Sequence, residues 1–175
     1  MIDWSVMAIL GSCLCGEVCF EIDAVSGPFE LCHCNRCRKL SGASSLPMIR
    51  IRTTDYRSIS GADSICAYEA PLLYRPPAYT SYFCGTCGSP VPPAEPEGDW
   101  VEVPAGVLDA DPGLKPDKHI FIEFVPEWDR ISDDLPQLTV PELHRQRYGK
   151  DLPDGFRVRP HQAKNAAALP GENNE

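Results

Sequence analysis

The chain has 175 residues, of which 43% are hydrophobic and 23% are charged, a balance typical of one globular domain with a buried core. Its formal net charge of −9 opposes contact with a phosphate backbone, which excludes nucleic acid as an expected partner. The first residues, MIDWSVMAIL, have no basic cluster and too short an apolar run for a signal peptide or a membrane span. We therefore expect a cytoplasmic protein with no membrane partner.

The predicted elements are mostly strands. Alternating apolar and polar side chains predict strands over 17–22, 47–52, 79–83, 100–106 and 119–124. Segments rich in proline and glycine separate them and predict loops. Short helices are expected over 35–42 and 141–149, where Pro141 suits a first turn and Gly149 a C-terminal stop. The sequence predicts a mainly β fold with few short helices.

The pattern predicts a single domain over 1–157, and the informative motifs lie between 11 and 128. The segment 158–175 has no apolar period, so we expect it to be a flexible C-terminal tail.

Nine cysteines in a chain expected to be cytoplasmic favour reduced thiols that act as ligands or nucleophiles over disulfides. An odd number also excludes complete internal pairing. Cys19 and Cys66 stand alone in the sequence, and we expect them to be small half-buried thiols.

Two pairs of cysteines predict a closed zinc site. The residues are Cys13, Cys15, Cys84 and Cys87. An extended backbone would place both sulfurs of the C-x-C pair on one side, and the C-x-x-C pair predicts a turn. Gly16 and Gly88 follow the pairs, where a residue without a side chain lets the backbone curl around the sulfurs. The alternative, two disulfides, is disfavoured because a C-x-C bridge is strained.

The stretch CHCNRC supplies Cys32, Cys34 and Cys37 but no obvious fourth ligand. Three protein ligands with an open position are typical of a catalytic zinc, where water or substrate completes the coordination. His33 is an alternative ligand, but its ring is expected to point away from its two cysteine neighbours.

Positive charge accompanies this second cluster. Arg36, Arg38 and Lys39 would offset the charge of three thiolates or receive an anionic substrate. His119 could face the site, although a core or strand-end histidine is the favoured interpretation. No Ser/His/Asp constellation accompanies the serines after the cluster, which argues against a nucleophilic serine there.

An ordered set of motifs resembles one known family. GSCLCGEVCFE, CHCNRCRKLSGAS, YFCGTCGSPV, VPAGVLD and HIFIEFVPEW are similar, in that order, to the glutathione-dependent formaldehyde-activating (GFA) family, which includes the centromere protein V domain. The resemblance runs from about Gly11 to Trp128. It implies a single domain of several coiled antiparallel β-sheets around two zincs, an Mss-type fold. It also implies a structural zinc on Cys13, Cys15, Cys84 and Cys87 and a catalytic zinc on Cys32, Cys34 and Cys37.

The same resemblance implies an activity. The namesake enzymes join glutathione to formaldehyde as an S-hydroxymethyl adduct, which makes them carbon–sulfur lyases acting on a small thiol and an aldehyde. Two other hypotheses remain: a noncatalytic zinc module that binds a protein partner, and a zinc ribbon that binds nucleic acid. The acidic charge disfavours the ribbon. An open metal position separates an enzyme from the noncatalytic module, which has no need of one.

Overall fold

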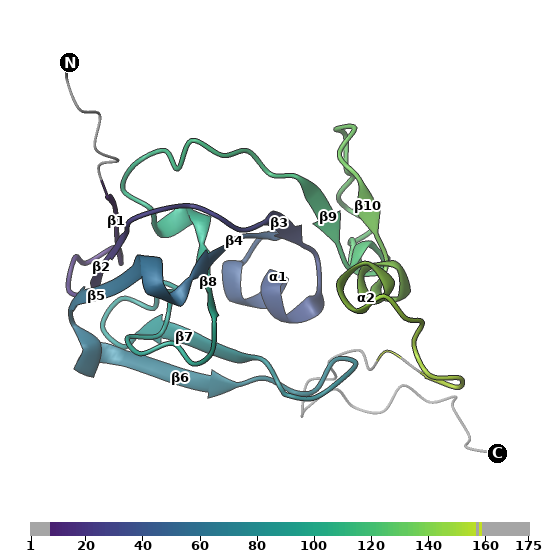
Figure 1. The fold of residues 1–175 in the computed structure, drawn as a ribbon, viewed down its shortest axis with the longest axis horizontal. Coiled ribbons are helices and arrows are strands. Elements are labelled where there is room, and N and C mark those ends of the chain that lie inside the picture. Colours follow the sequence, from purple (N-terminus) through teal and green to yellow (C-terminus); the bar gives the residue numbers. More distant parts are fainter. Residues whose placement is uncertain (1–7, 157, 159–175) are drawn as a thin grey trace.

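The computed structural model describes residues 8–156 and residue 158. Among these residues the chain forms three β-sheets and two short α-helices, so the predicted mainly β fold is confirmed (Figure 1). Apart from Val158, the tail expected over 158–175 lies outside the described residues.

A five-stranded sheet organises the molecule, in the order β10-β9-β3-β4-β8. Its strands are β3 (Phe29–Cys32), β4 (Leu46–Arg52), β8 (Trp100–Pro104), β9 (Lys118–Ile120) and β10 (Gln137–Leu138). β4 pairs antiparallel with β3 and β8, whereas β9 runs parallel to both β3 and β10. The sheet is mixed because the long connection after β8 carries the chain across to the far side of β3, where β9 pairs parallel with it.

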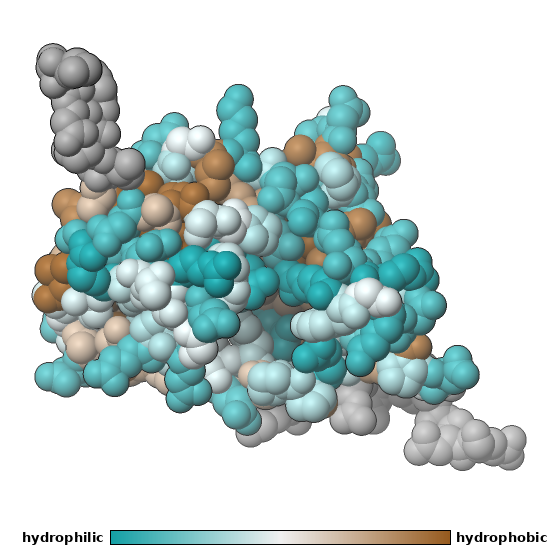
Figure 2. Space-filling model, viewed as in Figure 1, coloured by the Kyte–Doolittle hydropathy of each residue, from teal (hydrophilic) through white to brown (hydrophobic). Residues whose placement is uncertain are grey.

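Two smaller sheets flank this one. β1 (Ile9–Ser12), β2 (Cys19–Ile22) and β5 (Tyr56–Ser60) form the first, and the hairpin of β6 (Ile65–Glu69) and β7 (Thr80–Cys84) forms the second. Most of the face in Figure 2 is hydrophilic, and hydrophobic residues gather near the end where β1, β2 and β5 lie.

The two faces of the central sheet have different roles. On one face, Ile49, Ile51 and Val103 pack against Phe20 and Ile22 from the first small sheet. On the other face, Cys32, Leu46, Met48 and Ile120 pack with the helices. Strand alternation turns the next residues along this second face, Arg50 and Glu102, toward the same side. The second face therefore passes from an apolar region to a charged one.

The two helices cover the second face. α1 (Asn35–Ser41) contacts β4, and α2 (Val140–Tyr148) contacts β10 (Figure 1). Both end at a left-handed glycine, Gly42 or Gly149, as C-terminal stops commonly do. The predicted helices are thus correct to within one residue at each end. Neither helix is both long and apolar enough to cross a membrane.

Three predicted strands are too long. The strand expected over 119–124 ends at Ile120, because Phe121 adopts a left-handed conformation (φ 61°) and a 3₁₀ turn, Ile122–Phe124, follows. The strand expected over 100–106 ends at Pro104, where a 3₁₀ turn begins. The first strand starts at Cys19 rather than residue 17, since a turn precedes it.

Gly61 lies in close contact with the loop that follows Cys13 and Cys15. Its φ is 73°, and a Cβ here would lie 2.3 Å from the carbonyl oxygen of Glu17. The Glu17 carboxylate accepts hydrogen bonds from the hydroxyls of Ser64 and Thr86, which dock this loop against the 3₁₀ turn before β6 (Ala62–Ser64) and the turn after β7. Gly61 therefore has both a conformational and a steric reason to lack a side chain.

Gly61→Ala should lower the free energy of unfolding by more than about 1 kcal/mol, because alanine opposes the positive φ and its methyl group meets backbone. Gly106→Ala is the matched control, since Gly106 has no positive φ and no neighbouring atom within 4 Å of its would-be Cβ. Urea unfolding followed by circular dichroism measures both. Equal midpoints for the two variants would contradict this account.

Candidate metal centres

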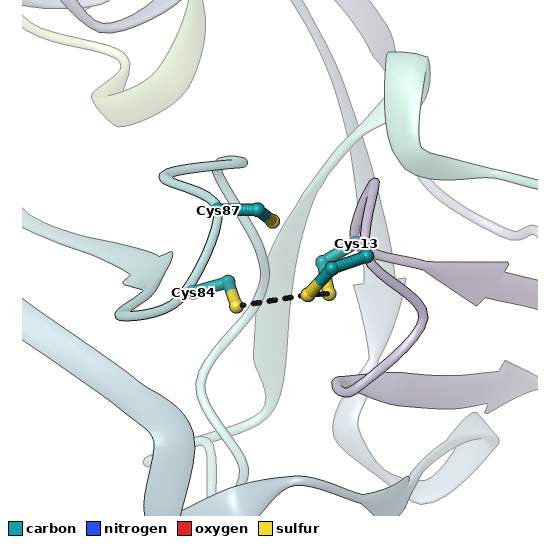
Figure 3. A group of neighbouring side chains, drawn as sticks. Cys13, Cys84 and Cys87 are labelled. Carbon is teal, nitrogen blue, oxygen red and sulfur yellow. Dashed lines mark hydrogen bonds between the residues drawn. The ribbon is translucent and has the colours of Figure 1, made fainter.

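The first cluster of thiols joins two turns that are distant in the sequence. Cys13 and Cys15 lie in the turn between β1 and β2, while Cys84 and Cys87 flank the turn after β7. All four sulfurs lie within 4.8 Å of one another. Figure 3 shows Cys84 and Cys87 directed toward Cys13 across the gap between the two turns. The structure therefore brings together the four residues that the spacing grouped.

The local backbone at Cys13 and Cys15 is a turn, not the extended segment that we expected. The Gly16 N–H donates to the carbonyl oxygen of Cys13, and the Gly88 N–H donates likewise to Cys84. Both glycines have a φ of 76°. Each pair of cysteines is thus presented by a turn that a left-handed glycine closes, three residues after Cys13 and four residues after Cys84, because glycine adopts this conformation without strain.

Hydrogen bonds favour thiolates in this cluster. The Val18 N–H donates to the sulfur of Cys13 over 3.3 Å. Ser89 donates to the sulfur of Cys87 from its hydroxyl, which lies 3.3 Å away, and this contact lowers the pKa of Cys87 to about 5. The surroundings therefore stabilise the charged form of Cys13 and Cys87, whereas contact with the neighbouring thiols raises the pKa of Cys15.

The second cluster contains Cys32, Cys34 and Cys37. Cys32 ends β3, Cys34 caps the N-terminus of α1, and Cys37 lies in its first turn. Their sulfurs also lie within 4.8 Å of one another, and all three residues are buried. Among the described residues, no fourth histidine, cysteine or acidic side chain joins them at this distance. The arrangement offers three protein ligands.

The three buried thiols cannot all ionise on their own. Hydrogen bonds from Cys32 and Cys37 lower the pKa of Cys34, whose sulfur also accepts the N–H of Cys37. Donating to this thiolate raises the pKa of Cys32 well above its usual value, and the pKa of Cys37 is raised as well. Without a cation, one thiolate is therefore held by two neutral thiols. A bound cation would remove this restriction.

The geometry of both clusters fits zinc. A tetrahedral zinc with bonds of about 2.3 Å to sulfur places its sulfurs about 3.8 Å apart. In the first cluster, the sulfur of Cys15 lies 3.4 Å from that of Cys13 and 3.8 Å from that of Cys84. No cysteine in the described part of the chain forms a disulfide. Each cluster could therefore hold one metal ion.

A chain of hydrogen bonds passes behind the second cluster. The Nδ1 of His33 lies 3.0 Å from the carbonyl oxygen of Ser44, and its Nε2 lies 2.8 Å from the Nδ1 of His119. The Nε2 of His119 lies 3.1 Å from the carboxylate of Asp133. Since the Ser44 carbonyl can only accept, His33 donates to it from Nδ1, and His119 donates from Nε2 to the carboxylate of Asp133. One of the two rings donates to the other between Nε2 of His33 and Nδ1 of His119.

These hydrogen bonds hold the backbone between Cys32 and Cys34 in place. The His33 N–H also donates to the carbonyl oxygen of Ile120, and both histidines are buried. His33 therefore points away from the sulfurs, and His119 is a buried histidine of β9. Sequence reasoning missed their contact, because the parallel pairing of β3 with β9 leaves no local signal.

The predicted positive side chains have different surroundings. Arg36 lies beside the second cluster, and its charge contributes to the lowered pKa of Cys34. Arg38 donates to the carbonyl oxygen of Phe124 and lies over the ring of Trp128. Lys39 is exposed. The structure thus places only Arg36 next to the thiols.

The two remaining cysteines belong to neither cluster. Cys19 is half-buried, as expected, and its thiol donates to the carbonyl oxygen of Gly16. Cys66 is exposed, so its expected half-burial is wrong. Its β6–β7 hairpin lies at the surface and leaves that side of the strand uncovered.

These features define a class: a small, mainly β protein with two cysteine clusters suited to metal. The chain belongs to the GFA family, since the family model described as "Glutathione-dependent formaldehyde-activating enzyme" matches residues 8–124. A protein of Halomonas elongata described as "Putative glutathione-dependent formaldehyde-activating enzyme" is 27% identical over 151 residues, covering 79% of this chain and 95% of the relative. A crystal structure of a Rhodobacter sphaeroides protein aligns with a TM-score of 0.43 and 22% identity, over 61% of this chain and 91% of that one.

Protein purified without chelator should contain two zinc ions per chain, because there are two compact sets of thiols. Elemental analysis by inductively coupled plasma mass spectrometry measures this ratio. A reproducible value of one zinc per chain would mean that one of the two clusters does not bind zinc.

Loss of a ligand should affect the two clusters differently. Cys84→Ser should lower the free energy of unfolding by more than about 3 kcal/mol, because this cluster links two distant turns. Cys34→Ser should mainly release one zinc, since Cys32, Cys34 and Cys37 are close in the sequence and the rest of the core around them remains. Thermal unfolding and zinc content measure both effects. Equal losses of stability would contradict this division.

Proposed function

We propose that the protein is a zinc-dependent carbon–sulfur lyase of the GFA type, which forms or cleaves an S-hydroxymethyl adduct such as S-hydroxymethylglutathione. Cys32, Cys34 and Cys37 would hold the catalytic zinc. The structural zinc would be held by Cys13, Cys15, Cys84 and Cys87. Membership of the family supports the reaction. The observation that carries the proposal is the second cluster, which offers three buried sulfurs and no fourth protein ligand among the described residues.

The proposed reaction balances without an oxidant or a reductant. The thiol sulfur forms a bond to the carbon of formaldehyde, the π electrons of the carbonyl move to oxygen, and the thiol proton ends on that oxygen. Cleavage is the reverse. Zinc bound with an open position would act as a Lewis acid that favours a thiolate or polarises a carbonyl. A free thiol has a pKa near 8.5, so help with ionisation matters at neutral pH.

The chain itself would supply burial, orientation and charge. The three cysteines belong to the same buried cluster as Met48, Leu73 and Leu143, and burial strengthens electrostatic interactions there. Arg36 places a positive charge beside the cluster. His119, held by Asp133, orients His33 and with it the backbone that carries Cys32 and Cys34.

The first cluster would have a structural role. It would carry a closed metal site that holds the β1–β2 turn against the end of β7, with no position for a substrate. Its thiols must stay reduced to bind metal, in agreement with the proposed cytoplasmic setting. The alternative of a noncatalytic zinc module remains the second candidate, favoured only if the second cluster has no exchangeable position.

Exchange kinetics test the activity. Glutathione and formaldehyde combine spontaneously, so an enzyme changes the rate of approach to equilibrium and not its position. Exchange-spectroscopy NMR on a mixture of the two should show faster interconversion with wild-type protein than with Cys34→Ser, which removes one thiolate of the second cluster. Cys66→Ser is the matched control, because Cys66 is an exposed cysteine outside both clusters and its variant should retain the wild-type rate.

If wild-type protein does not accelerate exchange for glutathione or for a panel of other small thiols, the lyase proposal fails for those substrates. An equal acceleration by wild type and Cys34→Ser would instead mean that the second cluster is not the site of reaction.

A further inference from the structure

A cavity of about 340 Å³ lies beside the second cluster. This volume is within the range of roughly 300–1,000 Å³ that small-molecule sites occupy. Residues from four parts of the fold line it, among them Arg36, Arg50, Arg75, Tyr79, Glu102 and Tyr148. The cavity thus forms where the charged end of the central sheet meets α1, the loop before β7 and the end of α2.

The three arginines of the cavity have no carboxylate partner. Among the described residues, Arg36, Arg50 and Arg75 form no ion pair, whereas Arg57, Arg145 and Arg147 each do. The Nε atoms of Arg36 and Arg50 are also buried without an acceptor. A buried donor left without an acceptor costs free energy. An anion bound to the other N–H groups of these two arginines would offset part of that cost through its charge.

Aromatic rings hold these guanidinium groups in place. Arg36 lies over Tyr79 with 5.4 Å to the ring centre, Arg50 over Trp100 with 5.2 Å, and Arg75 over Tyr148 with 4.2 Å. Stacking uses the face of a guanidinium group and leaves its N–H edges free for a carboxylate. The arginines are therefore oriented in advance and still able to bind.

One carboxylate shares the cavity with them. Glu102 faces Arg50 across the β4–β8 pair and forms no ion pair among the described residues. Its side chain reaches solvent within the cavity but is otherwise surrounded by protein, and this loss of bulk water raises its pKa. The lining therefore combines the guanidinium groups of three arginines with one carboxylate, which forms no ion pair among the described residues.

Two residues of the lining relate the cavity to the second cluster. Arg36 lies between Cys34 and Cys37 in the sequence, and its charge acts on Cys34. Burial and then the charges of Cys37 and Glu102 raise the pKa of Tyr79, on which Arg36 lies. Arg36 and Tyr79 thus belong both to the lining of the cavity and to the electrostatic surroundings of the cluster.

We propose that this cavity binds the charged part of a small thiol that carries both carboxylates and an ammonium group. Arg50 and Arg75 receive the carboxylates, Glu102 receives the ammonium group, and the sulfur of the ligand points past Arg36 toward the three cysteines. This inference rests on the proposed function and names residues that select its thiol. Glutathione has the required groups, whereas an uncharged thiol such as 2-mercaptoethanol would gain nothing from the cavity.

Binding of S-methylglutathione tests the proposal separately from catalysis, because its blocked sulfur cannot add to formaldehyde. Isothermal titration calorimetry on zinc-loaded protein should give a dissociation constant that rises at least about tenfold in Arg50→Gln and in Arg75→Gln, as expected for loss of a charge-assisted contact. Arg52→Gln is the matched control. Arg52 stacks on the same Trp100 with 4.0 Å to the ring centre but does not line the cavity, so its variant should bind like wild type.

Glu102→Gln tests recognition of the ammonium group. Wild type should prefer S-methylglutathione over its N-acetyl derivative by at least about tenfold, and Glu102→Gln should lose this preference. Zinc content and thermal unfolding check that each variant is folded. If Arg50→Gln does not fold, Arg50→Lys serves instead, because it keeps the charge but loses the two-pronged contact with a carboxylate.

Three results would overturn the inference: no binding of S-methylglutathione to wild type up to about 10 mM, equal affinities in wild type, Arg50→Gln and Arg75→Gln, or an unchanged preference in Glu102→Gln. Exchange kinetics separate this failure from failure of the proposed function. If the protein accelerates exchange but both arginine variants bind S-methylglutathione like wild type, the cavity is rejected as the binding site and the lyase activity stands. Arginine-dependent binding without accelerated exchange rejects the lyase activity and leaves the cavity as a site for such thiols.

Discussion

Repulsion among crowded thiolates constrains the whole arrangement. Three buried sulfurs within 4.8 Å of one another allow one thiolate, held by two neutral thiols, unless a cation joins them. The fold nevertheless brings seven cysteines into two compact sets, of which only the second is wholly buried, and it does so with turns, a strand end and a helix cap. A fold that concentrates thiols in this way gains stability from a metal ion, because metal binding and folding are then coupled.

The central sheet links the metal centre to the surroundings that would recognise a substrate. Cys32 lies at the end of β3, and Met48, Arg50 and Glu102 follow on the same face of the neighbouring strands. Because side chains alternate between the two faces of a strand, this one face presents in turn a buried sulfur, the apolar side chain of Met48, and the opposite charges of Arg50 and Glu102. The helices and the loop before β7 enclose the charged end. Chemistry and recognition are thus positioned by one rigid element, which favours a reproducible geometry between them.

Local patterns in the sequence were sufficient for the two helices, for the approximate position of five strands and for the grouping of the cysteines, but they missed β1, β3, β5, β6 and β10. The pairs at Cys13 and Cys84 are each followed by glycine, and both helices end at glycine, so these features depend on nearby residues only. The parallel strand β9, the left-handed Phe121 and the contact between His33 and His119 depend on pairing across the chain. The cavity is the extreme case. Its residues come from positions 36, 50, 75, 102 and 148, and their spacing in the sequence carries no periodic signal.

The charge of the whole molecule opposes the ligand that the cavity suits. With a formal net charge of −9, the protein repels an anionic thiol at long range, so electrostatic steering cannot account for its capture. At physiological ionic strength, however, charges more than about 8 Å apart are largely screened. Among the residues that line the cavity, Arg36, Arg50 and Arg75 outweigh Glu102. Recognition of an anion therefore has to come from short contacts made after entry, and it is these contacts, rather than the charge of the surface, that would distinguish one thiol from another.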